Sequence, residues 1–194
     1  QHIKRERATS NICTASALMA SMTGFYCVYN GPEGLRRAAE TAHLAAATVA
    51  RALEAMDYRL ASKEFFDTLE VEAEAAVVQS LALEQGINFY YPSEGRVRMS
   101  FDEVTTAAEI ETVVSIFAAA KGKKAKAVKA VTESCVPTAL RRQSPYLQEP
   151  VFNVYRSESA LMRYIKKLEL RDISLANSMI SLGSVSYTHL RAHE

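Results

Sequence analysis

The feature that most limits how this chain can fold is an uncharged stretch from Ala8 to Pro32. The stretch is long enough to cross a bilayer. It is nevertheless interrupted by hydroxyl and amide side chains, which hydrocarbon does not accommodate: Thr9, Ser10, Asn11, Thr14, Ser16, Ser21, Thr23 and Asn30. We therefore predict a helix over about residues 14–29 that is buried in a protein core, and no membrane segment.

The residues that follow, up to about residue 120, predict a compact α+β unit. Asn30-Gly31-Pro32 is typical of a helix end, and a second helix is expected to open at Pro32. Further elements are predicted in this order: a strand over 65–71, a helix over 74–85, paired strands over 87–91 and 96–101, and a helix from Thr106. Glu109 stands three residues after Thr106, which is the spacing of a capping box. The pattern favours helices packed on a small, mostly antiparallel sheet.

Regular periodicity ends after this unit. A lysine run begins at Lys121, and prolines then interrupt the chain up to Pro150, so we interpret residues 121–150 as a linker crossing the surface. A short helical segment follows, with Ser157 predicted to cap its main helix.

Composition excludes several classes of function. The net charge of +1 gives no electrostatic reason to expect a nucleic-acid partner, and three cysteines at unrelated spacings do not predict a disulfide framework or a zinc site. The first residues carry no apolar run behind a basic head, so we expect no secretory signal. These features favour a cytoplasmic protein without a metal.

A few residues have the chemistry of a site, and each also has a structural interpretation. His43 is interpreted as a solvated residue on the polar face of its helix rather than a catalytic group. The Asp102-Glu103 pair is interpreted as helix-start electrostatics rather than an acid–base pair. Cys13 is interpreted as a buried thiol rather than a helix-activated thiolate. The lysine run is interpreted as linker, with nucleic-acid binding as the weaker alternative.

The sequence resembles that of one family in several ordered segments. Residues 1–15, QHIKRERATSNICTA, resemble the QHIRREKATSNICTA segment of the glycine dehydrogenase (decarboxylating) family, the P-protein of the glycine cleavage system. Residues 26–35 resemble its YAVYHGPxGL, with Asn30 in place of His. FDTL at 66–69, DEVTT at 102–106 and PVFNVYRSE at 150–158 resemble further segments in the same order. The resemblance continues through Arg163-Tyr164, Leu168-Glu169 and residues 179–184.

This resemblance implies a fold-type-I pyridoxal-phosphate enzyme built of two similar halves. It implies that residues 1–120 are the small, C-terminal domain of the first half, that 121–150 link the halves, and that 151–184 open the second half. The family decarboxylates glycine on pyridoxal phosphate and transfers the aminomethyl group to a lipoyl-carrying H-protein. The complete enzyme is expected to be a homodimer or heterotetramer.

The resemblance also implies that the catalytic apparatus is not in this sequence. The family's Schiff-base lysine lies further into the second half, so we expect this fragment to bind no cofactor, to have no catalytic residues and to be inactive. The alternative is a non-catalytic scaffold or interaction half-subunit of a pyridoxal-phosphate enzyme complex. Thr9, Ser10 and Asn11, at a predicted helix start, are candidates for an interface between the halves, near the active site. Residues 185–194 depart from the family pattern and resemble a translated sequencing adapter, so they are left out of the fold and function arguments.

Overall fold

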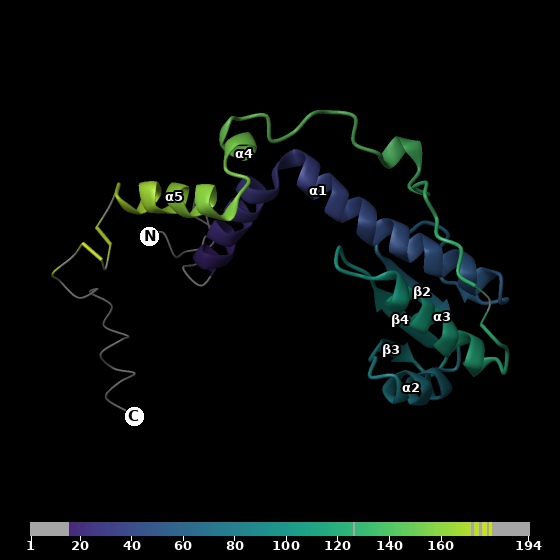
Figure 1. The fold of residues 1–194 in the computed structure, drawn as a ribbon. Helices are drawn as coiled ribbons and strands as arrows, with labels where there is room; N and C mark the ends of the chain where they lie inside the picture. The colour runs from purple at the N-terminus through teal and green to yellow at the C-terminus, as the bar shows by residue number, and fades with distance from the viewer. Residues whose placement is uncertain (1–15, 126, 172, 175, 178, 180–194) are drawn as a thin grey trace, which may run out of the picture. The chain divides into compact units, whose positions relative to one another are not determined.

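A computed structural model describes residues 16–125, 127–171, 173–174, 176–177 and 179 (Figure 1). Contacts within the chain divide it into two compact units, one formed by residues 33–146 and one formed by the segments on either side of it. The elements in chain order are α1 (Ala17–Glu54), β1 (Arg59–Leu60), β2 (Thr68–Glu72), α2 (Ala75–Glu84), β3 (Tyr90–Ser93), β4 (Arg96–Ser100), α3 (Ala107–Ala120), the 3-10 helix η2 (Thr138–Leu140), α4 (Val151–Val154) and α5 (Glu158–Glu169).

The unit of residues 33–146 contains a four-stranded antiparallel sheet in the order β1-β2-β4-β3. In the register between β2 and β4, Leu69 lies opposite Met99 and Val71 opposite Val97. All four side chains are buried, whereas the alternate residues of both strands face outward. The sheet therefore has one buried face, as its alternating sequence predicts.

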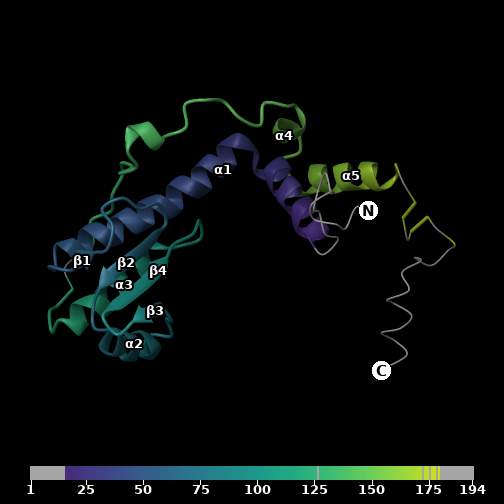
Figure 2. The ribbon, with the colours of Figure 1, turned by 180° about the vertical axis from the view of Figure 1, so that it is seen from behind.

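Helices cover that buried face. The later part of α1 contributes Val49 and Leu53, which are fully buried, and α3 contributes Phe117. Tyr58, just after α1, donates a hydrogen bond from its hydroxyl to the carbonyl of Phe117 at 2.8 Å and packs edge-on against the Phe117 ring. The prediction of helices on a small antiparallel sheet is confirmed, and Figure 2 shows α1, α2 and α3 around the strands from the opposite side.

Helix α1 is interrupted where the sequence predicts a helix end. Gly31 has φ 61° and ψ −178°, a non-helical conformation that only glycine adopts readily. Pro32 follows, where the fixed φ of proline suits the start of the next helical piece. The two predicted helices thus join as one element with a break at Gly31.

The helical piece before Gly31 is more exposed than the sequence analysis expects. Its large apolar side chains Leu18, Met19, Met22, Tyr26 and Tyr29 are each at least 38% exposed. The prediction that this helix is buried is therefore wrong for the described residues. In the part of the chain that the structure describes, no helix has the length and apolar character needed to cross a membrane.

Helix α5 and the residues before it pack on one side of this helical piece. All of these residues belong to the unit formed by the segments on either side of residues 33–146. The rings of Phe25 and Tyr164 meet edge-on, with their centroids 6.5 Å apart, and Tyr164 also stacks on Tyr155. Helix α5 begins as predicted, since the hydroxyl of Ser157 accepts a hydrogen bond from the amide of Ala160.

The predicted linker differs most from its sequence-based interpretation. Residues 121–146 belong to the same compact unit as the sheet, and both ribbon views show them following α1 (Figures 1 and 2). As the chain advances, its contacts move backward along that helix: Lys121 Nζ to the Met56 carbonyl, the Val131 amide to Thr48 Oγ1, and the Cys135 amide to His43 Nε2. We call residues 121–146 the strap. Val131 is buried, so the strap is bound to the helix rather than loosely crossing the surface.

Candidate functional site

The side chains with the most chemistry gather where the strap crosses α1. A cavity of about 590 Å³ lies there, entirely within the unit of residues 33–146. Its polar lining comes from α1 and from the end of the strap and includes Arg36, Glu40, His43, Arg141, Arg142 and Ser144.

His43 is the centre of the contact between strap and helix, and its placement corrects the sequence interpretation. Only 2% of the residue is exposed, so it is not a solvated surface side chain. Its Nδ1 lies 2.8 Å from the Phe66 carbonyl, and its Nε2 accepts a hydrogen bond from the Cys135 amide at 3.1 Å. Because Nε2 accepts, Nδ1 carries the proton and donates to Phe66. The ring also stacks on Phe66, with centroids 5.4 Å apart.

This arrangement limits the chemistry open to His43. A neutral imidazole has one acceptor nitrogen, and that lone pair already receives the Cys135 amide. The Cys135 thiol lies 3.4 Å from the same nitrogen, so His43 does not supply it with a free general base. In this arrangement the pair fixes the strap to the helix.

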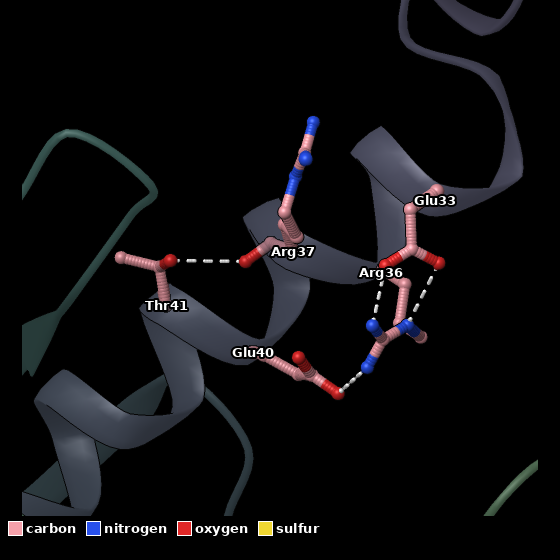
Figure 3. Close-up of polar contacts among 5 residues, drawn as sticks. All are labelled: Glu33, Arg36, Arg37, Glu40 and Thr41. Carbon is pink, nitrogen blue, oxygen red and sulfur yellow. Dashed lines mark hydrogen bonds and ion pairs between the residues drawn. The ribbon is translucent and has the colours of Figure 1, made fainter. Parts of the chain in front are cut away.

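The guanidinium of Arg36 is held by carboxylates of its own helix. It bonds both carboxylate oxygens of Glu33 and one oxygen of Glu40, as Figure 3 shows. The hydrogen bonds to Glu33, followed by the charges of both carboxylates, raise the pKa of Arg36 above its ordinary value. The side chain of Arg37 extends away from this group (Figure 3). Arg36 therefore lines the cavity with its positive charge already paired with two carboxylates.

The two arginines of the strap are held differently. Arg141 donates from Nε to the Val136 carbonyl and from Nη2 to the Ser134 carbonyl, both at 2.8 Å. Arg142 donates to Ser144 Oγ at 3.0 Å, and its guanidinium lies 5.3 Å from the centroid of the Tyr146 ring. These partners are neutral, so the cavity carries positive charge on its strap side.

Two residues of the lysine run contact the turn that follows the C-terminus of α1. Lys121 Nζ donates to the carbonyls of Met56 and Asp57, and Lys123 Nζ forms an ion pair with the Asp57 carboxylate. Lys121 also lies over the Tyr58 ring, 4.0 Å from its centroid. A cation at a helix C-terminus is favoured by the helix dipole. These two lysines thus have a structural role.

The Asp102-Glu103 pair precedes α3, as the sequence predicts. Asp102 Oδ1 accepts hydrogen bonds from the Val104 amide and from Thr105 Oγ1. The Thr106–Glu109 capping box is present, with both reciprocal hydrogen bonds. Asp102 therefore has local hydrogen-bond partners in the turn that leads into α3.

The remaining sequence-predicted positions lie outside the described residues. This applies to Thr9, Ser10 and Asn11, the interface candidates, and to Cys13. Among residues 16–179, apart from the undescribed positions 126, 172, 175 and 178, no group of three His, Cys, Asp or Glu side chains could hold a metal ion. Arg141 and Arg142 are not predicted from the sequence, where the only signal is a basic pair within a proline-punctuated stretch.

Comparison with known proteins assigns the class of this domain. Residues 1–117 match the sequence profile of the glycine cleavage system P-protein family. The chain is 49% identical over 185 residues to a glycine dehydrogenase (decarboxylating) of Flavobacterium johnsoniae and 43% identical over 185 residues to that of Christiangramia forsetii. Each alignment covers 95% of this chain and 20% of the relative. The chain belongs to the glycine cleavage system P-protein family.

A solved structure agrees with this assignment. The chain is similar to a crystal structure of glycine decarboxylase (P-protein) of the glycine cleavage system in inhibitor-bound form, with a TM-score of 0.51 and 26% identity. That match covers 62% of this chain and 30% of the solved chain. The chain thus spans about a fifth of the length of the curated relatives it matches.

Proposed function

We propose that this chain is a segment of a glycine dehydrogenase (decarboxylating) and that it contributes packing and connection rather than the chemical step. The observation that carries the proposal is its similarity to such enzymes over 95% of its own length but only 20% of theirs. The intact enzyme would decarboxylate glycine and transfer the aminomethyl group to the lipoyl-carrying H-protein. The chain alone would be inactive.

The exposed apolar face of α1 supports a packing role. Leu18, Met22, Tyr26 and Tyr29 recur at intervals of three and four residues, so they form one stripe on the helix. A contiguous apolar face of this kind marks a surface that another protein surface covers. Because the relatives are about five times as long as this chain, we assign the cover to the remainder of the same enzyme.

The intact enzyme would use pyridoxal phosphate as its electron sink, with a lysine holding the coenzyme as an imine. The cavity beside His43 does not fit that role. The lining of the cavity beside His43 contains no lysine, and the amines of Lys121 and Lys123 are bound to the end of α1. We therefore derive no catalytic step from these residues and assign the coenzyme to another part of the enzyme.

The arrangement within the enzyme is proposed to follow the family. Residues 1–120 would form the small domain of the first half, residues 121–150 would connect the halves with the strap packed along α1, and residues 151–184 would start the second half. Thr9, Ser10 and Asn11 would lie at the interface between the halves. The complete enzyme would be a cytoplasmic homodimer or heterotetramer.

A chimera tests this proposal. The segment of the Flavobacterium johnsoniae relative that aligns with this chain is replaced by residues 1–184, and release of labelled carbon dioxide from carboxyl-labelled glycine is measured with H-protein present. We expect the chimera to be active, and an Asn11→Ala variant of it to lose activity or assembly.

Two outcomes would overturn parts of the proposal. A chimera that folds and assembles but does not decarboxylate glycine would favour the non-catalytic half-subunit. Unchanged assembly and turnover after Asn11→Ala would remove the interface assignment.

A further inference from the structure

The cavity between α1 and the strap has a feature that the proposed packing role does not use. Its walls combine guanidinium groups with apolar side chains, and all of its lining lies within one compact unit. We propose that this cavity binds a small organic anion, whose carboxylate or phosphate group is held by Arg141 and Arg142.

The charges around the cavity favour an anion. Within the described part of the chain, no carboxylate lies within ion-pair distance of Arg141 or Arg142, whereas Arg36 is compensated by Glu33 and Glu40. The two strap arginines are adjacent in sequence and line the same cavity. Two guanidinium groups whose partners are neutral favour an anion, and their planar donors match a carboxylate or a phosphate.

The second step is preorganisation. Arg141 is anchored by two carbonyls at 2.8 Å, and Arg142 by Ser144 Oγ and the Tyr146 ring. A guanidinium has five N–H donors, so donors remain on both groups after these bonds are made. Because two carbonyls already hold Arg141, less conformational entropy is lost at that residue when an anion binds.

The third step concerns the rest of the ligand. Phe66, Val136 and Leu140 line the same cavity, and Phe66 and Leu140 are 47% and 69% exposed. The volume of about 590 Å³ falls in the range of small-molecule sites. Exposed apolar walls beside the arginines favour an anion that carries an apolar group over an inorganic anion.

Equilibrium dialysis of the full chain at low salt tests the inference, with phenyl phosphate as the probe. Inorganic phosphate tests the apolar contribution, and benzyl alcohol tests the requirement for charge. Arg142→Gln is the main variant, because Arg142 is exposed and its bond to Ser144 is local. Arg37→Gln is the matched control, because Arg37 is an exposed arginine on α1 that does not line the cavity. Circular dichroism and thermal melting verify that each variant is folded.

We expect saturable binding of phenyl phosphate. Arg142→Gln should weaken the affinity about tenfold or more, because losing a hydrogen bond to a charged group lowers affinity by about that factor. Arg37→Gln should leave binding unchanged, and raising the salt concentration should weaken it. Equal binding to the Arg142→Gln variant, or no saturable binding, would overturn the inference. Phosphate binding as tight as phenyl phosphate would overturn the assignment of the apolar wall. Neither result would affect the chimera experiment, because the inference does not depend on the proposed function.

Discussion

The backbone amide of Cys135 donates a hydrogen bond to Nε2 of the buried His43 at 3.1 Å, across 92 positions of the chain. This bond, with that of the Val131 amide to Thr48 Oγ1 at 3.0 Å, fixes the strap along α1. A segment that composition alone describes as a linker is thereby part of a folded unit. The order of its contacts along the helix defines the path by which the chain returns from α3.

The first prediction concerns His43. His43→Leu keeps much of the side-chain volume but removes the acceptor for the Cys135 amide and the donor to Phe66. We expect the free energy of unfolding to fall by about 3 kcal/mol, since buried polar groups lose their partners. Urea unfolding measures the change, and hydrogen exchange should show faster exchange of the Cys135 amide.

Cys135→Ala is the control for this variant. It keeps the backbone amide and alters an exposed side chain, so we expect a change below about 0.5 kcal/mol. If the cysteine variant destabilised as much as His43→Leu, the thiol rather than the amide would hold the strap.

Gly31 provides the second prediction. Its φ of 61° and ψ of −178° are a conformation that costs other residues about 1–3 kcal/mol. A Cβ at this position would also lie 2.7 Å from the Phe152 carbonyl and would meet the Arg156 guanidinium. Gly31→Ala should therefore destabilise the contact between α1 and α4, seen as faster limited proteolysis near Phe152.

Gly24→Ala is the matched substitution for Gly31→Ala. Gly24 lies in a regular part of α1, and no heavy atom would lie within 4 Å of the added Cβ. Alanine is favoured over glycine in a helix by up to about 1 kcal/mol, so this change should be neutral or stabilising. Equal protease sensitivity of the two variants would contradict the role assigned to Gly31.

The sequence predicted the local parts of this architecture well. The Thr106–Glu109 spacing predicted the start of α3, and the alternation around Val97 and Met99 predicted the buried face of β4. Both features are set by residues that lie within a few positions of each other in the sequence. The two-residue strand β1 carried no periodic signal because it is too short to show one.

The candidate site was much less predictable. Helical periodicity predicts His43 on a polar face, but the strap that covers this face comes from a distant part of the sequence. Arg141 takes its partners from backbone carbonyls, which leave no trace in side-chain composition. Met22 is exposed, and its apolar helical pattern alone does not distinguish an exposed face from a covered one. Each case is decided by non-local contacts.

The third prediction concerns acid stability. Glu70 bonds Arg98 and Arg96 across the sheet, and these hydrogen bonds, that to Arg98 first, hold the pKa of Glu70 below its ordinary value of 4.5. A carboxylate with a lowered folded-state pKa stabilises the fold above its unfolded pKa. That stability is lost as the pH falls from about 4.5 through the lower folded-state value.

Melting temperatures from pH 7 to pH 2 test this prediction in the full chain and in a Glu70→Gln variant. The variant should melt lower at neutral pH and should lose less stability on acidification, so the two curves approach each other. Parallel curves over the whole range would show that Glu70 does not contribute to acid sensitivity.

The fourth prediction concerns the exposed face of α1. We expect the purified chain to self-associate through this face, and Met22→Glu to reduce the association because it places charge among Leu18, Tyr26 and Tyr29. Ala20→Glu is the control, since Ala20 is exposed on the opposite side of the helix. Sedimentation velocity measures the mass distribution. A monomeric, cooperatively melting chain would refute the prediction.

The account depends on one claim, that this chain provides packing and connection while the chemistry of glycine decarboxylation resides elsewhere in the enzyme. The most direct test incubates the purified chain alone with pyridoxal phosphate and carboxyl-labelled glycine. The absorbance above 400 nm of the dialysed protein and the labelled carbon dioxide are measured, with a full-length relative as positive control. The account predicts no absorbance from a lysine imine after dialysis and no release of label, because coenzyme held only through its phosphate in the cavity beside Arg141 and Arg142 is removed by dialysis. A yellow protein that releases labelled carbon dioxide by itself would contradict it.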